Sequence, residues 1–307
     1  MKKVLIVGGA GFIGFPLTKR LISEKYDVKV FDNFSNQSKN YSNDSLSIIQ
    51  GDITNRGDVI KCVRDTKPDI IIHLAAQHYI PFCIEDPITT KKINVTGTKN
   101  ILDAIKEFSR KTHFIFTSSA AVYAPENKAH TETSEIGSLD VYGETKIEAE
   151  NITKKYASSY GNEYTILRLF NVYGFGDNTP HLIPTIIEQV KKGSVIKLGN
   201  IEARRDYIYL DDVMNGFMSA IQNIEVSKNH TFNLGSGKTY SAKEIVDNIG
   251  GDIKKHLKIE VENERMRRND RPISLADISK INKYLGWKPR YNLHKGLTLL
   301  LNQEGLM

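Results

Sequence analysis

The feature that most constrains the fold is a glycine-rich turn near the start of the chain. The segment GGAGFIG follows a short apolar run at 3–7 and leads into a stretch with helical periodicity at 12–23. Gly8, Gly11 and Gly14 let the backbone approach a pyrophosphate closely, and backbone N–H groups and the helix dipole can then hold the anion. The alternative is a tight strand-to-helix turn that binds nothing.

The first half of the chain alternates short β-branched runs with longer amphipathic segments. This pattern is typical of βα units that form a parallel sheet. Helices are predicted at 12–23, 55–64, 88–108 and 142–159, and strands at 3–7, 28–32, 46–50, 69–74, 114–117 and 164–169. The order predicts an α/β protein with a doubly wound parallel sheet, a Rossmann fold, and helices on both faces.

The regular alternation stops after about residue 170, where turns rich in glycine, proline and charge become frequent, as in NVYGFGDNTP and KLGNIEARRD. We predict an NAD-binding Rossmann domain over residues 1–170 and a smaller mixed α/β domain, which binds the substrate, over residues 171–307. No repeat or proline-rich linker separates the two, so we expect them to interleave in one packed body.

Composition argues against several classes of function. No run approaches 18 apolar residues and no signal-peptide cleavage pattern follows the apolar start, so we expect a cytoplasmic protein without membrane attachment. Cys62 and Cys83 form no CxxC pair, so no disulfide framework and no metal site are predicted. The net charge of +6 is spread widely without a nucleic-acid-binding motif, so no nucleic-acid partner is expected.

Asp32 indicates which dinucleotide binds. It ends the second predicted strand, 18 residues after Gly14. A carboxylate there can accept hydrogen bonds from the ribose hydroxyls of NAD and would repel the 2′-phosphate of NADP. The following Asn33 and Phe34 supply no positive charge. We therefore expect NAD as the cofactor, because a turn-initiating aspartate would not explain this spacing.

A tyrosine and a lysine indicate the chemistry. Three pairs have YxxxK spacing, but only Tyr142 and Lys146 open a plausible helix, after a strand that brings Ser118 and Ser119 to the carboxyl edge of the sheet. Tyrosine, with a pKa of about 10, is a poor base unless a nearby cation stabilises its phenolate. We expect Tyr142 as the base, Lys146 as that cation and Ser119 beside the reacting oxygen. The alternative is a solvated helix face.

The chain resembles the extended short-chain dehydrogenase/reductases over nearly its whole length, and among them the nucleotide-sugar epimerases and dehydratases. The resemblance is carried by GGAGFIG, GDIT, HLAAQ, NVTGT, SSAAVY, YGETK, RLFNVYG, RRDYIYLDDV and NDRPISLADISKINKYLGWKP. It implies an NAD-dependent enzyme acting on a nucleotide-sugar. It also implies a homodimer built from helices near 88–108 and 142–159.

The resemblance also implies the residues of both binding sites. For NAD these are Gly8, Gly11, Phe12, Ile13, Gly14, Asp32, Asn33, Asp52, Ile53, Leu74, Ala75, Ala76, Asn94, Thr117, Tyr142 and Lys146. For the nucleotide-sugar they are His78, Ser118, Ser119, Asn171, Leu182, Lys197, Arg205, Arg267 and Ser274. The two arginines suit a diphosphate, since guanidinium groups bind phosphate bidentately, although solvated surface charge is the alternative.

Two alanines narrow the reaction. The 4,6-dehydratases of the family carry Asp and Glu directly after the active-site Ser or Thr, where this sequence has Ala120 and Ala121. Alanine can do no acid–base work, so we expect a 4-epimerase that oxidises carbon 4 and returns the hydride to the other face. The expected substrate is a UDP-hexose, UDP-N-acetylhexosamine or UDP-uronic acid. The alternatives are a dehydratase, decarboxylase or reductase of the family, and a non-catalytic NAD-binding sensor or scaffold.

Two positions bear on the sugar. By the family's spacing, Ser274 stands where a bulky aromatic restricts some epimerases to simple hexoses, so room for an N-acetyl group is expected. The segment QHYIPFCI at 77–84 is unlike the family's patterns, and it is expected beside the sugar. Within it, His78 is the residue expected to make specificity unusual.

Overall fold

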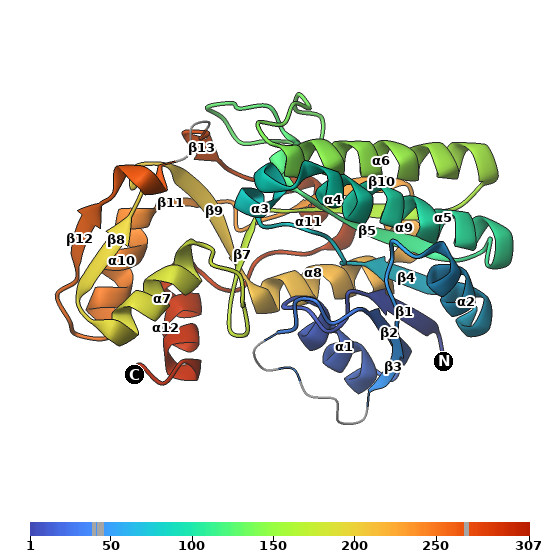
Figure 1. Cartoon of the computed structure of the whole chain (residues 1–307), viewed down its shortest axis with the longest axis horizontal. Helices are drawn as coiled ribbons and strands as arrows, with labels where there is room; N and C mark the ends of the chain where they lie inside the picture. The colour runs from blue at the N-terminus through green and yellow to red at the C-terminus, as the bar shows by residue number, and fades with distance from the viewer. Residues whose placement is uncertain (39–40, 42–45, 267–269) are drawn as a thin grey trace.

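The computed structural model describes residues 1–38, 41, 46–266 and 270–307. Figure 1 shows a large sheet with helices on both faces, next to a smaller group of helices and short strands that contains the C-terminus. None of the helices in the described ranges is both long and apolar enough to span a membrane.

Seven parallel strands form the large sheet, in the order β10-β6-β5-β4-β1-β2-β3. The chain order reverses at β1, with β2 and β3 on one side and β4, β5 and β6 on the other, and ligands of such sheets bind at the carboxyl ends of the strands beside this reversal. The doubly wound α/β fold is therefore confirmed. The strands are β1 (Lys3–Val7), β2 (Asp27–Asp32), β3 (Ser47–Gln50), β4 (Ile70–His73), β5 (His113–Ser119), β6 (Tyr164–Leu169) and β10 (His230–Leu234).

Helices cover both faces of the sheet, because alternate residues of each strand point to opposite faces. Val4 packs in one apolar cluster with Leu17 and Phe217, whereas the next residue, Leu5, packs in another with Ile101. The first cluster joins the sheet to α1 (Gly14–Ser23), α8 (Leu210–Gln222) and α11 (Ser279–Leu285). The second joins it to α2 (Arg56–Thr66), α5 (Gly97–Phe108) and α6 (Val141–Tyr160), and Figure 1 shows α5 and α6 together over this face.

The smaller part has its own apolar core between three helices and short strands. Its sheets have the orders β11-β9-β13, with β7 also paired to β9, and β12-β8. The helices are α7 (Leu182–Lys192), α10 (Ala242–Asp252) and α12 (Leu293–Gln303). The strands are β7 (Asn171–Tyr173), β8 (Val195–Leu198), β9 (Arg204–Tyr209), β11 (Thr239–Ser241), β12 (Lys258–Val261) and β13 (Ile273–Ser274).

The chain crosses between the two parts more than once. After entering the smaller part at β7 it returns to the large sheet as α8 and β10, and again as α11. The remaining short helices are α3 (Ile80–Glu85), α4 (Pro87–Lys91), the π-helix η1 (Lys92–Thr96), the 3-10 helices η2 (Ala120–Val122) and η3 (Asn263–Arg265), and α9 (Ile224–Ser227). Of these, α3 is absent from the sequence prediction, and η1 interrupts the single helix predicted at 88–108.

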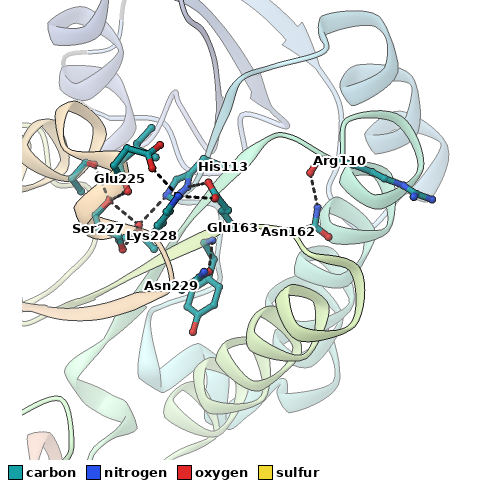
Figure 2. Close-up of polar contacts among 12 residues, drawn as sticks. Arg110, His113, Asn162, Glu163, Glu225, Ser227, Lys228 and Asn229 are labelled. Atoms are coloured by element: carbon teal, nitrogen blue, oxygen red, sulfur yellow. Dashed lines mark hydrogen bonds and ion pairs between the residues drawn. The ribbon is translucent and has the colours of Figure 1, made fainter.

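A polar cluster closes the amino-terminal edge of the large sheet, as Figure 2 shows. His113 starts β5, and its Nε2 lies 2.9 Å from the Thr165 hydroxyl. Burial lowers the pKa of His113 to about 4, so the ring is neutral at neutral pH. Nearby, Lys228 pairs with Glu163 at 3.1 Å and with Glu225 at 2.7 Å. These contacts fasten the edge opposite to the one expected to bind ligands.

Candidate active site

A cavity of about 870 Å³ lies at the carboxyl edge of the large sheet and extends to strands of the smaller part. Every predicted site residue that the structure describes lines it, apart from Asn94. Arg267 lies outside the described residues. From the cofactor set, the lining includes Gly8, Gly11, Phe12, Ile13, Gly14, Asp32, Asn33, Asp52, Ile53, Leu74, Ala75, Ala76, Thr117, Tyr142 and Lys146. From the substrate set, it includes His78, Ser118, Ser119, Asn171, Leu182, Lys197, Arg205 and Ser274.

The glycine-rich turn forms one end of this cavity. A Cβ on Gly8, whose φ is +85°, would lie 2.6 Å from the backbone nitrogen of Ala75, and one on Gly14 would lie 2.1 Å from the carbonyl oxygen of Gly8. Gly11 is less crowded, with its nearest neighbour at 3.5 Å. Helix α1 begins here without a side-chain cap or an acidic residue in its first turn. The turn therefore leaves space and uncapped N–H groups for an anion.

Asp32 stands at the end of β2 with its carboxylate held in place. Its two oxygens accept hydrogen bonds from the backbone N–H groups of Ala10, at 2.9 Å, and Phe34, at 2.7 Å. Burial raises the pKa of Asp32, and these hydrogen bonds oppose the rise. Each carboxylate oxygen can accept a further hydrogen bond, so the group is positioned to take the two hydroxyls of a ribose.

Asp52 and Asn33 support each other on the next part of the wall. The Asn33 amide donates to Asp52 at 2.9 Å, and the backbone N–H of Thr54 donates to the other carboxylate oxygen at 2.7 Å. Burial raises the pKa of Asp52, but these hydrogen bonds outweigh it and leave the pKa below its usual value. Both residues border the cavity with Ile53. The predicted adenine end is therefore a wall with a fixed carboxylate.

Tyr142 and Lys146 lie one helical turn apart at the start of α6. Asp140 caps the helix by accepting a hydrogen bond from the Gly143 N–H at 2.9 Å. The Lys146 ammonium donates to the carbonyl of Thr117 at 2.8 Å and lies 5.9 Å from the centre of the Tyr142 ring. The cap and the hydrogen bond fix the lysine beside the tyrosine.

Burial acts on both ionisable groups. It lowers the pKa of Lys146 to about 8, with the carboxylate of Glu150 opposing the change. It raises the pKa of Tyr142, against the effect of a hydrogen bond from Ser119. Burial therefore favours the neutral phenol of Tyr142, and a positive charge beside the ring is needed to make it a base. Lys146 supplies such a charge below about pH 8.

A buried ion pair lies next to Tyr142 and Lys146. Arg168 donates to both oxygens of Glu150, at 2.8 and 2.7 Å. The Ser118 hydroxyl also donates to Glu150, at 2.6 Å, so it is committed to this pair. Glu150 follows Lys146 by one helical turn. Neither charged residue was predicted from the sequence, although the four-residue spacing from Lys146 places Glu150 on the same helix face.

Asn94 lies on the π-helix η1, behind the cavity wall. Its amide nitrogen donates to the carbonyl of Gln77 and to the Thr145 hydroxyl, both at 2.9 Å. Its amide oxygen accepts from the Gln77 N–H at 2.8 Å. The residue thus fastens the loop after β4 to α6. The structure places it as a support for that loop, and not on the surface where the cofactor is expected.

His78 belongs to a cluster that joins two distant loops. Its Nε2 lies 3.2 Å from the Thr179 hydroxyl, and its ring centre lies 5.5 Å from that of His181. His181 in turn contacts the Asp177 carboxylate at 3.0 Å. Burial, helped by His181, lowers the pKa of His78 to about 4, so the ring is neutral. Thr179, His181 and Asp177 also line the cavity, and the sequence analysis missed them.

The smaller part contributes the cationic end of the cavity. Arg205 on β9 forms an ion pair with Asp270, and Lys197 on β8 pairs with Glu262 at 2.8 Å. Ser274 on β13 is directly opposite Arg205 in the parallel register. Arg271, which was not predicted from the sequence, also lines the cavity. The only signal for it was its place in the run NDRPIS, beside residues already selected.

A known protein family and its members match most of this chain. The model of the NAD dependent epimerase/dehydratase family matches residues 4–235. The chain is 33% identical over 310 residues to the UDP-glucose 4-epimerase of Lactobacillus helveticus, covering 94% of this chain and 92% of that protein.

Solved structures show the same fold over the whole chain. The UDP-glucose 4-epimerase of Brucella ovis in complex with NAD has a TM-score of 0.90 at 29% identity and covers 99% of both chains. The UDP-glucuronic acid 4-epimerase of Bacillus cereus, in complex with UDP-glucuronic acid and NAD, has a TM-score of 0.90 at 25% identity and covers 99% of this chain and 100% of that one. The chain therefore belongs to the NAD-dependent epimerase/dehydratase family, which its sequence motifs predict.

Proposed function

We propose that this protein is a nucleotide-sugar 4-epimerase that uses NAD and acts on a UDP-hexose, a UDP-N-acetylhexosamine or a UDP-uronic acid. The observation that carries the proposal is the cavity wall itself: it presents Ser119, Tyr142 and Lys146, and the two residues after Ser119 are alanines. The names of the L. helveticus and B. cereus relatives, both 4-epimerases of UDP-sugars, support it.

The dinucleotide fits the residues at the other end of the cavity. The open space at Gly11 and the uncapped start of α1 suit a pyrophosphate, and the carboxylate of Asp32 suits a ribose with two free hydroxyls. Asp52 and Ile53 would border the adenine. When bound, NAD supplies a hydride acceptor that can also return the hydride.

The protein's own residues would handle the proton and orient the sugar. Tyr142 takes the proton from the hydroxyl on carbon 4 and gives it back once the sugar has turned over. Ser119, one residue before Ala120, holds the oxygen on carbon 4 while it changes between hydroxyl and ketone. Lys146 stabilises the phenolate form of Tyr142 through its positive charge.

The diphosphate would lie against the smaller part. Arg205 borders the cavity together with Asn171, and Leu182 there begins α7, an eleven-residue helix whose N-terminal turn lines the cavity. Backbone N–H groups at a helix start and a guanidinium both favour phosphate oxygens. We assign Arg267 to the same task from its sequence alone.

Turnover by matched variants tests the proposal. Wild-type protein and Tyr142→Phe are incubated with NAD and with UDP-, dTDP-, CDP- and GDP-sugars, and the products are separated by chromatography. We expect the wild type to convert one or more UDP-sugars to their 4-epimers, and the variant to lose at least about 100-fold in kcat. Inactivity of both proteins on every sugar would favour the sensor or scaffold.

We also propose a cytoplasmic homodimer in which α5 and α6 of each subunit pack against those of the other. Ile84 and Ile88, 62% and 82% exposed, lie on α3 and α4, which contact α6. Covering these side chains would remove apolar surface from water. Light scattering after size exclusion should give twice the mass of the chain, and Ile84→Asp with Ile88→Asp should shift it to the monomer mass.

A further inference from the structure

One buried arginine on the cavity wall has no part in the function proposed above. Arg271 precedes β13, is 9% exposed, and lines the cavity. Its guanidinium donates from Nη1 to the carbonyl of Ala120 at 3.2 Å and from Nη2 to the carbonyl of Ala121 at 3.5 Å. A guanidinium has five N–H donors in a planar fork, so these two carbonyls leave donors for another acceptor.

Arg271 differs in ion pairing from the cationic residues near it. On the same cavity wall, Arg205 pairs with Asp270, and Lys197 and Arg265 both pair with Glu262. Within the part of the chain that the structure describes, no carboxylate lies within 4.0 Å of Arg271.

Longer-range charges do not neutralise it. Burial lowers the pKa of Arg271 and the nearby Arg205 lowers it further, while Asp140 and Asp270 act in the opposite direction. A guanidinium stays protonated in proteins, so a positive charge remains buried at this place. Burying a charge without a counter-ion is costly, and a bound anion removes that cost.

The position of the guanidinium indicates which part of a substrate it meets. Ala120 and Ala121 directly follow Ser119, which is expected to hold the oxygen on carbon 4. Carbon 6 of a hexose is two bonds from carbon 4, so its substituent can reach the same segment. The small methyl side chains of the two alanines, both on the cavity wall, leave room there.

We propose that Arg271 binds a carboxylate at carbon 6 of the sugar, so that the preferred substrate is a UDP-hexuronic acid. This inference rests on the proposed 4-epimerase function. The planar fork of arginine matches a carboxylate bidentately, and the neutral hydroxymethyl group of a hexose would leave the charge unpaired. The diphosphate is the other anion of such a substrate, and the experiment separates the two.

Kinetics on two sugars test the assignment. NAD-loaded wild type, Arg271→Gln, Arg271→Lys and a control, Arg204→Gln, are assayed with UDP-glucuronate and UDP-glucose. Arg204 begins β9, pairs with Glu244 at 3.0 Å, and is not among the described residues that line the cavity. We expect wild type to prefer UDP-glucuronate, and Arg271→Gln to lose roughly 10- to 100-fold in kcat/KM on it while changing little on UDP-glucose.

The other variants and outcomes decide the interpretation. Arg271→Lys keeps the charge and should recover part of the activity on UDP-glucuronate, and Arg204→Gln should match wild type. An equal loss on both sugars would place Arg271 at the diphosphate or in a structural role, and would overturn the proposal. So would a wild-type preference for UDP-glucose.

Binding keeps the test independent of turnover. Calorimetry is carried out on NAD-loaded wild type and Arg271→Gln with UDP, UDP-glucose and UDP-glucuronate. The wild type should bind UDP-glucuronate more tightly than UDP-glucose, and Arg271→Gln should not. If no sugar is epimerised, the proposed function fails, and these titrations still decide the role of Arg271. Weaker binding of UDP itself to Arg271→Gln would contradict the carboxylate assignment.

Discussion

At the scale of single residues, the site contains charged side chains whose burial costs folding free energy. Lys146 is an ammonium held at 4% exposure by a carbonyl, and Asp32 is a carboxylate held by two N–H groups. Such groups destabilise the fold relative to apolar residues and persist where chemistry needs them. Replacing such a side chain by an apolar one should therefore raise stability while lowering activity.

Lys146→Met should stabilise the protein while abolishing turnover. The pKa of Lys146 falls from 10.5 to about 8 on folding, which corresponds to roughly 3 kcal/mol against the charged form. Since the unfolded lysine binds its proton more tightly, the penalty is fully present below pH 8 and disappears as pH rises towards 10.5. Urea unfolding from pH 6.5 to 10 checks this: the advantage of the methionine variant should shrink with pH. A destabilised variant at every pH would contradict it.

Asp32→Ala should weaken NAD and relax the choice of cofactor. Loss of hydrogen bonds to a charged group costs about 1.5–3 kcal/mol, or roughly 10- to 100-fold in Kd. NADP should be discriminated against less, because the carboxylate that repels its 2′-phosphate is gone. Calorimetric titration of both dinucleotides measures the ratio. An unchanged preference for NAD would show that other residues select the cofactor.

At the scale of elements, packing requirements at the first turn decide whether the cofactor end forms. Helix α1 can approach β1 only because Gly14 has no Cβ. A Cβ there would lie 2.1 Å from the carbonyl oxygen of Gly8. Gly251, near the end of α10, has no atom of another described residue within 4 Å of the corresponding position, apart from its chain neighbours and the backbone of its own helix. An added methyl group should therefore have opposite effects on stability at the two glycines.

Gly14→Ala should therefore damage the protein and Gly251→Ala should not. The first forces α1 away from β1, so we expect a loss of about 1–3 kcal/mol and of NAD binding. The second adds a methyl group in open space within a helix, and should stabilise by roughly 0.5–1 kcal/mol. Thermal unfolding with and without NAD distinguishes them. Equal behaviour of the two variants would contradict this account of the turn.

An element can be predicted from the sequence where the residues that cause it to form lie within the element itself. The strands and long helices of the first half show in their periodicity, and Asp32, Tyr142 and Lys146 lie in short motifs. Helix α3 has six residues in an apolar segment with Pro81 in its first turn, too short for periodicity to show. The return of β10 to the large sheet depends on packing between distant segments, which periodicity does not report.

The remaining site residues depend on contacts across the chain. His78 meets Thr179 across 101 residues, and Arg271 meets Ala120 across 151. Nothing local distinguishes Thr179 and Arg271 from solvated residues. The structure is needed to show that Arg271 is buried and that Asn94 supports a loop behind the cavity wall.

At the scale of the whole molecule, the cavity exists because two parts of the chain meet. The large sheet supplies the residues proposed for the dinucleotide and the proton, and the smaller part supplies the cations proposed for the diphosphate. Contacts tie the two together beside the cavity: Ser38 donates to the Gly176 carbonyl at 3.0 Å, and Arg271 reaches Ala120. This arrangement suits the proposed nucleotide-sugar, with its sugar beside Tyr142.

The most direct test follows hydride through the reaction. UDP-glucose and UDP-glucuronate, each with deuterium at carbon 4, are incubated with the NAD-loaded protein in ordinary water, and the recovered sugars are analysed by mass spectrometry and NMR. We predict that the 4-epimer keeps its deuterium at carbon 4, because the hydride returns to the carbon it left. Washout of the label into solvent, or release of water or carbon dioxide without epimer, would contradict the proposed function.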